Sequence, residues 1–245
     1  MTWLAGIDGC PAGWFRACRE TETGELRFDL LRDVRALTEA DPRPEVVALD
    51  MPVGLAESGP RACDTLARAH LGPRRSSVFP APVRAALAAR SHAEASALHE
   101  AADGRRVSAQ AWNLFARIRA VDDWLAVDAD ARQRVVEVHP ELAFGTWAGE
   151  AVGGPGAEGT PRPMAHGKRT AEGRAERLAL VEAWLGAGVL ERARGDHRRR
   201  DLADDDILDA LACLHTAHRI AEGRALSLPE PPPVDARGLP MRIVG

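Results

Sequence analysis

Three short apolar runs of the sequence end on an acidic residue or just before one, and these acids are Asp8, Asp50 and Glu141. If the three runs are parallel neighbouring strands, their carboxyl ends lie at one edge of a sheet, where open α/β sheets bind ligands. We therefore expect the three carboxylates to lie close together. The alternative for Asp8 is a hairpin turn, because Asp-Gly is a common turn pair. The alternative for Asp50 is a simple strand exit.

A fourth source of acids is the segment "DDDILDALACLHTAHRIAEG" (204–223), which has helical spacing. Asp206 and Asp209 are three residues apart and so lie on one face of the predicted helix. Asp204 and Asp205 are expected to cap the positive N-terminus of this helix, and capping is also an alternative for Asp206. Asp209 lies beyond the first turn among apolar residues, where a carboxylate is poorly placed unless it meets a cation.

Clustered carboxylates raise one another's pKa, and burying an unpaired charge is costly. Such a cluster therefore needs cations, and Mg²⁺ or Mn²⁺ suits a site made of oxygen ligands. Two divalent ions about 4 Å apart can activate water and stabilise the leaving oxygen in phosphodiester cleavage. We predict Asp8, Asp50 and Asp209 as metal ligands, and these three together with Asp206 and Glu141 as the catalytic acids.

The elements that must position these acids follow from the apolar pattern. Alternation over 13–20 and 25–31 predicts two strands that form a meander with the first run, and 45–50 and 134–142 predict two further strands. The strands at 2–8, 45–50 and 134–142 are separated by helical segments, which require parallel crossovers. This order predicts an α/β fold, namely a ribonuclease-H-like mixed five-stranded sheet flanked by helices.

We expect this fold to form one domain over residues 1–245. A helical insertion of about 55–130 should separate strands 4 and 5, and an extended tail should occupy about 226–245. Helices are predicted at 33–40 with Asp33 as cap, 59–72, 108–126 with Ser108 as cap, and 171–185. The Gly/Pro-rich stretch 151–163 is expected to be a loop.

Composition excludes several classes of protein. A formal net charge of −4 argues against a surface that binds nucleic acid throughout, although basic runs such as "HRRR" (197–200) remain candidates for local contacts. The four cysteines lack metal-ligand spacing and are too sparse for a disulfide framework, which favours a reducing compartment. We find neither a signal peptide nor a run of roughly 20 apolar residues that could span a bilayer. The protein is expected to be cytoplasmic.

Several blocks of the sequence resemble a known family, the domain-of-unknown-function family 429 (DUF429), whose members are described as ribonuclease-H-like nucleases. The blocks run in order from residue 5 to about 225: "GIDGCPAGW", "LDMPVGL", "RACDTLARAHLGPRRSSVFPAPVR", "SAQAWNL", "VEVHPELAF", "GRAERL" and "DDDILDALACLHTA". The last block also resembles the terminal acidic helix of Holliday-junction resolvases, at Asp206 and Asp209. The resemblance implies the fold and a metal site, and it does not supply a reaction.

Candidate substrate-binding residues lie mainly in the central block of this resemblance. They are Arg61, Arg74, Arg75, Ser77 and, beyond the block, His139. Arginine can hold a phosphate through two parallel hydrogen bonds, so we expect Arg74 and Arg75 to face the acids. Surface ion pairs are the alternative for these two arginines. An ordinary hydrogen-bonded histidine is the alternative for His139.

The leading interpretation is a divalent-metal-dependent nuclease or phosphodiesterase that acts on nucleic acid or a nucleotide, with no membrane partner. A non-catalytic nucleic-acid or nucleotide-binding module of the same fold is the first alternative. An actin-like ATPase or sugar kinase is the second, although the chain offers no second strand-Asp-x-Gly hairpin for phosphate. A Gly-x-Ser-x-Gly motif is absent from the sequence, which disfavours a covalent hydrolase. DNA, RNA and nucleotides remain open as substrates, as do endo- and exonucleolytic action and a homodimer.

Overall fold

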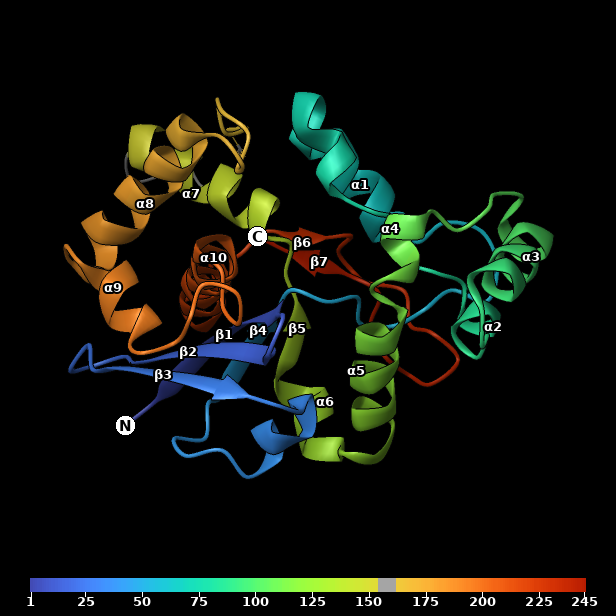
Figure 1. Ribbon diagram of the computed structural model, residues 1–245, viewed down its shortest axis with the longest axis horizontal. Coiled ribbons are helices and arrows are strands. Elements are labelled where there is room, and N and C mark those ends of the chain that lie inside the picture. The colour runs from blue at the N-terminus through green and yellow to red at the C-terminus, as the bar shows by residue number, and fades with distance from the viewer. Residues whose placement is uncertain (154–161) are drawn as a thin grey trace.

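The computed structural model describes residues 1–153 and 162–245, and its centre is a five-stranded mixed sheet (Figure 1). The strand order is β3-β2-β1-β4-β5. The strands are β1 (Trp3–Cys10), β2 (Gly13–Glu20), β3 (Leu26–Leu31), β4 (Val46–Leu49) and β5 (Val135–Glu137). β1 to β3 form an antiparallel meander, whereas β4 and β5 run parallel to β1. This arrangement confirms the predicted ribonuclease-H-like mixed sheet.

The register of the parallel strands determines which side chains meet at the sheet edge. Ile7 of β1 pairs with Leu49 of β4, so Asp8 and Asp50, the next residue in each case, leave the sheet side by side. Leu49 in turn pairs with Glu137 of β5. The carboxyl ends of β1, β4 and β5 therefore lie at one edge, as the sequence predicts.

One face of the sheet is covered by the second half of the chain. Its helices are α7 (Pro140–Gly153), α8 (Ala171–Leu185), α9 (Val189–Arg194) and α10 (Asp204–Ala221), with α10 lying against β1 and β2 (Figure 1). Phe15, Ala48 and Phe144 belong to the apolar core on this side. Burying these side chains stabilises the fold by roughly 25 cal/mol for each Å² of apolar surface removed from water.

The opposite face packs against the short helices that connect the strands. These are η1 (Val34–Thr38), α2 (Arg84–Leu87), α3 (His92–Asp103), α4 (Ala109–Trp112), α5 (Phe115–Val127) and α6 (Ala129–Arg134). Ile7, Val47 and Leu49 point into this second core. The remaining elements of the crossover from β4 to β5, α1 (Ala62–Leu71) and η2 (Gly72–Ser77), pack near α7 and the C-terminal strands.

A glycine permits the closest helix-to-strand approach at the centre of the fold. A Cβ atom on Gly6 would lie 2.1 Å from the carbonyl oxygen of Ala210 and 2.1 Å from the amide nitrogen of Leu214. Both are backbone atoms of α10, so any side chain at position 6 would push this helix away from β1. Gly6 therefore lets α10 bring its acidic face to the carboxyl end of β1.

Several local predictions differ from the structure. The helix expected at 108–126 is two helices, α4 and α5, and Ser108 caps the first of them. The strand expected over 134–142 ends at Glu137, because Pro140 starts α7, where a proline at the first helical position fits well. The loop expected at 151–163 overlaps the end of α7, and residues 154–161 lie outside the described part of the chain.

The predicted extended tail carries a small sheet of its own. β6 (Ser227–Leu228) pairs antiparallel with β7 (Ile243–Val244), and Val244 forms a bridge with Val138 just after β5. Asp235 accepts a hydrogen bond from the backbone of Leu55, 180 residues earlier in the chain. The tail thus closes the fold beside the carboxyl end of the main sheet.

Within the described residues, no helix combines the length and the apolar character needed to cross a membrane. The four cysteines, Cys10, Cys18, Cys63 and Cys213, are buried free thiols.

Candidate metal centre

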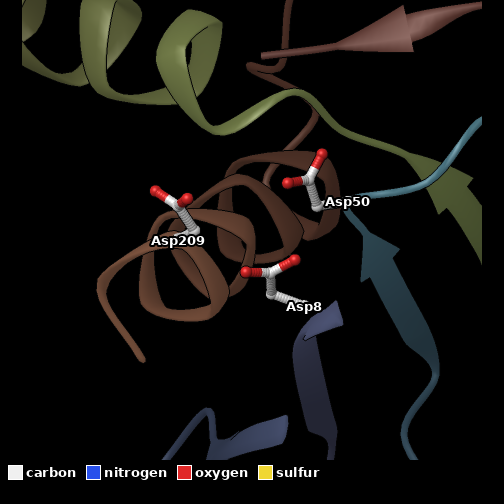
Figure 2. Close-up of side chains that lie close together, drawn as sticks. All are labelled: Asp8, Asp50 and Asp209. Atoms are coloured by element: carbon white, nitrogen blue, oxygen red, sulfur yellow. The ribbon is translucent and has the colours of Figure 1, made fainter. Parts of the chain in front are cut away.

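The structure brings together the three aspartates that the sequence predicts as metal ligands. Asp8 lies near the end of β1, Asp50 follows β4, and Asp209 lies on the second turn of α10. Each offers one carboxylate oxygen, and these oxygens all lie within 4.8 Å of one another. Figure 2 shows the three carboxylates converging from the two strand ends and the helix. We call Asp8, Asp50 and Asp209 the acidic triad.

The acidic triad is largely withdrawn from water, and this changes its protonation. Asp8 is 8% exposed and Asp209 is 3% exposed. Burial raises the pKa of Asp8 well above its ordinary value, and the charges of Asp50, Asp209 and Asp206 raise it further. Burial, followed by the charge of Asp209, raises the pKa of Asp50 to about 8. A protein without a bound cation therefore holds protons here at neutral pH, and a divalent cation would compete with those protons.

The donor set of the acidic triad fits a hard divalent ion. All three donors are carboxylate oxygens, the ligands that Mg²⁺ and Mn²⁺ prefer. Neither a histidine nor a cysteine belongs to the cluster. The arrangement can therefore hold a divalent metal ion.

One basic side chain that the sequence analysis did not single out reaches this cluster. Lys168 donates a hydrogen bond from Nζ to Oδ2 of Asp209 at 2.7 Å. The charge of Asp209 is the largest cause that raises the pKa of Lys168, with smaller contributions from Asp50 and Asp8. Asp209 does meet a cation, as its position among apolar residues requires. The amino-acid composition could have drawn attention to this residue, because Lys168 is the only lysine among the 245 residues.

The segment that carries Lys168 is fixed by hydrogen bonds on both sides. Arg74 donates to the carbonyl oxygens of Met164 and Ala165, at 3.2 and 2.9 Å. Glu176 of α8 accepts from the amides of Ala165 and His166, at 2.9 and 3.1 Å. The backbone before Lys168 is therefore anchored to η2 and to α8.

Glu141, a predicted catalytic acid, lies apart from the acidic triad. Its two carboxylate oxygens accept hydrogen bonds from Arg177 at 2.9 and 2.7 Å. Arg177 also donates to the carbonyl oxygen of His166 at 3.3 Å. Glu141 thus supports the segment that presents Lys168, and it also lines the same cavity as the triad.

Asp206 has a capping contact and faces the site as well. Its Oδ2 atom accepts a hydrogen bond from the amide of Ala203 at 2.9 Å, which caps α10. Burial, the largest cause, raises the pKa of Asp206. Asp204, expected as a cap, is instead buried and paired with Arg174, Arg194 and Arg199.

The acidic triad forms part of the wall of a cavity of about 670 Å³. Three predicted substrate-binding residues also line this cavity: Arg74, Ser77 and His139. Nε2 of His139 lies 3.2 Å from the carbonyl oxygen of Ser77, and burial lowers the pKa of His139, so the ring is neutral at pH 7. These three side chains could contact a ligand that reaches the acids.

The other two predicted substrate-binding residues do not line the cavity. Arg61 is 3% exposed and lies behind the wall, where its guanidinium is bonded to Asp64 and Glu137. Arg75 is exposed and lies outside the lining residues, unlike its neighbour Arg74. The run of two arginines therefore divides, with one side chain at the cavity and one at the outer surface.

Arg117 is a further cavity residue that sequence reasoning missed. Its guanidinium donates to the carbonyl oxygen of Cys10 at 2.5 Å. A Cβ atom on Gly9 would lie 3.0 Å from the Cδ and Nε atoms of Arg117, so the glycine after Asp8 makes room for this side chain. The helical pattern of α5 does not reveal which surface Arg117 lines. The fold shows that it lines the same cavity as the acids.

The sheet and the triad together define an α/β protein of ribonuclease-H-like architecture with an acidic centre that could bind a divalent metal. The sequence model of DUF429, described as a protein of unknown function, matches residues 6–234. The chain belongs to this family, as the resemblance of its sequence blocks indicates. No curated protein and no solved structure matches the chain significantly.

Proposed function

We propose that the protein is a divalent-metal-dependent nuclease or phosphodiesterase that acts on nucleic acid or a nucleotide. The observation that carries this proposal is the acidic triad, whose ligand oxygens lie within 4.8 Å of one another in the wall of a large cavity. Three carboxylates in so small a space repel each other unless a cation offsets their charge. Mg²⁺ or Mn²⁺ is the cofactor that this donor set suits.

In this proposal Asp8, Asp50 and Asp209 hold the metal. When bound, the metal would supply an activated water and stabilise the charge on the leaving oxygen. Asp206 lies one helical turn before Asp209 and lines the same cavity, so its Oδ1 atom could orient the attacking water while Oδ2 caps the helix.

Cations around the acids favour an anionic substrate. Arg74, Arg117, Lys168 and Arg169 all line the cavity. Basic side chains can bind the non-bridging oxygens of a phosphodiester, and guanidinium groups can do so with two parallel bonds. The cavity lining thus combines a triad that could hold a metal with basic side chains that could contact a phosphate, which suits phosphodiester hydrolysis.

The decisive experiment removes one metal ligand without changing its size. Asp8→Asn should lower cleavage by several orders of magnitude, because both water activation and leaving-group stabilisation depend on the metal. The assay uses single-stranded and branched DNA, RNA and dinucleotides with Mg²⁺ or Mn²⁺. Calorimetry on the same samples should show that Asp8→Asn also loses metal binding.

A matched control is Asp205→Asn, which removes the same charge from the first turn of α10 at a residue outside the cavity lining. This variant should keep metal binding and cleavage. Wild-type cleavage that survives Asp8→Asn would disprove the mechanism. If the wild type binds nucleic acid but neither binds metal nor cleaves, the protein is a non-catalytic binding module instead.

A further inference from the structure

Lys168 has a position that no other basic residue of the cavity shares. Arg74 and Arg117 also line the cavity, but their guanidinium groups are bonded to backbone carbonyls. Lys168 is the one whose charged atom is bonded to the acidic triad, through Asp209. It is also the only lysine in a chain that otherwise uses arginine as its cationic side chain.

The difference between lysine and arginine matters at this position. An ammonium group is a compact point charge on a flexible stem, whereas a guanidinium is a planar fork that holds a carboxylate with two bonds. Nζ of Lys168 donates one hydrogen bond to Asp209, to its Oδ2 atom. A single contact of this kind can be broken by a competing cation more easily than a two-bond clamp.

The surroundings of Lys168 allow its side chain to move while its backbone stays in place. The preceding residues are anchored to Arg74 and Glu176, and Thr170 caps α8 on the other side. The side chain itself is 44% exposed, so it has room on the side of the cavity. Movement would therefore be confined to the torsions of the lysine stem.

We propose that Lys168 is a catalytic residue with two positions. In the metal-free protein its ammonium group offsets the charge of the acidic triad by holding Asp209. When a divalent cation binds the triad, repulsion displaces the ammonium, which then donates to a non-bridging oxygen of the scissile phosphate. This proposal rests on the proposed function, and it adds that one side chain serves first the empty site and then the substrate.

The first test measures metal affinity, a property that does not depend on turnover. Lys168→Met removes the competing cation and keeps a stem of similar length. With both proteins at the same pH, calorimetry should show Mn²⁺ binding about tenfold tighter than in the wild type. Turnover at saturating Mn²⁺ should fall about 100-fold in the same variant. A merely structural role for Lys168 would weaken both metal binding and turnover.

Two further variants sharpen this result. Lys168→Arg should bind Mn²⁺ more weakly than the wild type, because a guanidinium would clamp both oxygens of Asp209. Arg169→Met removes a positive charge from the neighbouring residue, which lines the cavity without a bond to the triad, and its metal affinity should stay close to wild type. If Arg169→Met and Lys168→Met increase the affinity for Mn²⁺ equally, the cause is the loss of a nearby positive charge. That result would overturn the proposal that the metal displaces the ammonium group of Lys168.

The second test uses the fact that the chain has one lysine. Protein labelled with ¹³C-lysine gives one lysine Cε signal, so no assignment is needed. Addition of Mg²⁺ should shift this signal toward its position in a free lysine, and a dinucleotide added with Ca²⁺ should shift it again. A signal that stays fixed while calorimetry reports Mg²⁺ binding would overturn the proposal.

The outcomes separate this inference from the function on which it rests. If the wild type binds no divalent metal, the proposed function fails and the role of Lys168 fails with it. If wild type and Lys168→Met bind metal equally and cleave equally, the proposed function stands and only the role of Lys168 is overturned.

Discussion

Two groups of buried and half-buried carboxylates line the same cavity, and they are paired with cations in different ways. The first is the acidic triad, whose bonded cation among the described residues is the single ammonium of Lys168. The second group, which we call the arginine-paired cluster, consists of Arg61, Asp64 and Glu137. Here one guanidinium makes two hydrogen bonds to each carboxylate, at 2.6 to 3.3 Å.

The arginine-paired cluster is a structural support. Oε2 of Glu137 accepts a hydrogen bond from the amide of Val53 at 2.7 Å, and Oδ2 of Asp64 accepts one from the amide of Ala81 at 3.0 Å. These bonds hold two loops of the cavity wall. Because the cluster already contains its own cation, it has no need of a metal.

The difference separates acids that are paired within the protein from acids that could take an external cation. In the arginine-paired cluster, two carboxylates share one buried guanidinium, which makes two hydrogen bonds to each of them. In the acidic triad, three carboxylates share one partly exposed lysine, and burial raises the pKa of Asp8 and Asp50. The larger excess of acids over cations, held by only one hydrogen bond from Lys168, marks the site that can take an external cation.

The largest effect should come from removing the cation of the arginine-paired cluster. Arg61→Met leaves two buried carboxylates without a cation, which should cost about 3–5 kcal/mol in the free energy of unfolding. Urea denaturation monitored by circular dichroism measures this loss. Adding Glu137→Gln to Arg61→Met should restore part of the stability. A loss below about 1 kcal/mol would contradict the structural role.

The contribution of Asp50 to the stability of the metal-free protein should depend on pH in the opposite sense from that of an aspartate in an ordinary salt bridge. The pKa of Asp50 is about 8 in the metal-free folded protein, against an ordinary value of 3.8. Its folded state thus binds more protons than its unfolded state between these values, so this contribution to stability is present below pH about 4 and is lost as the pH rises through about 8.

The comparison of wild type with Asp50→Asn isolates this contribution. The metal-free variant should gain stability relative to wild type as the pH rises from about 5 to 8.5, by at most about 1.4 kcal/mol per pH unit. Chemical denaturation in a chelating buffer measures the difference. Excess Mg²⁺ should reverse the trend, because it stabilises the ionised wild-type site. A difference that is independent of pH would show that Asp50 titrates normally.

A smaller effect is expected from a substitution that increases the distance between Asp8 and Asp209. Gly6→Ala places a Cβ against the backbone of α10, which should cost about 1–3 kcal/mol and weaken metal binding by moving Asp209 away from Asp8. Gly9→Ala is the matched control, because the nearest atoms to its Cβ belong to the flexible side chain of Arg117 rather than to backbone. Thermal denaturation and calorimetry measure the two effects. Equal losses in both variants would contradict the importance of close packing at Gly6.

The smallest effect should come from Arg75, which belongs to neither group of acids. Arg75→Ala should change the free energy of unfolding by less than about 0.5 kcal/mol and leave cleavage unchanged, because the side chain is exposed and lies outside the cavity lining. Arg74→Ala, in contrast, should lower cleavage, because Arg74 anchors the segment before Lys168. If Arg75→Ala reduces substrate binding as much as Arg74→Ala, the substrate reaches beyond the cavity.

The sequence predicts the sheet and the acidic triad well, for physical reasons. Apolar runs that end on Asp8 and Asp50 are local signals, and parallel strands bring such ends to one edge whatever the loops between them do. The position of Asp209 on α10 follows from helical periodicity and from its distance to the helix start. These features depend on patterns within a few residues of each acid.

Other parts of the site depend on contacts between distant segments, which local patterns do not reveal. Arg61 resembles a phosphate ligand in the sequence, but Glu137, 76 residues later, makes it part of a buried ion pair. Lys168 and Asp209 are 41 residues apart, and only the packing of the segment before α8 against α10 brings them together. Composition is the only sequence feature that could have indicated Lys168, since it is the sole lysine in a chain rich in arginine.

The spacing of the acidic triad along the chain also has a consequence for biosynthesis. Asp8 and Asp50 emerge early from a ribosome, but Asp209 is made only after more than 150 further residues. Until α10 has emerged and docked on β1, the nascent chain has only two of the three acids of the triad. The centre that could hold a divalent ion is therefore completed only late in synthesis.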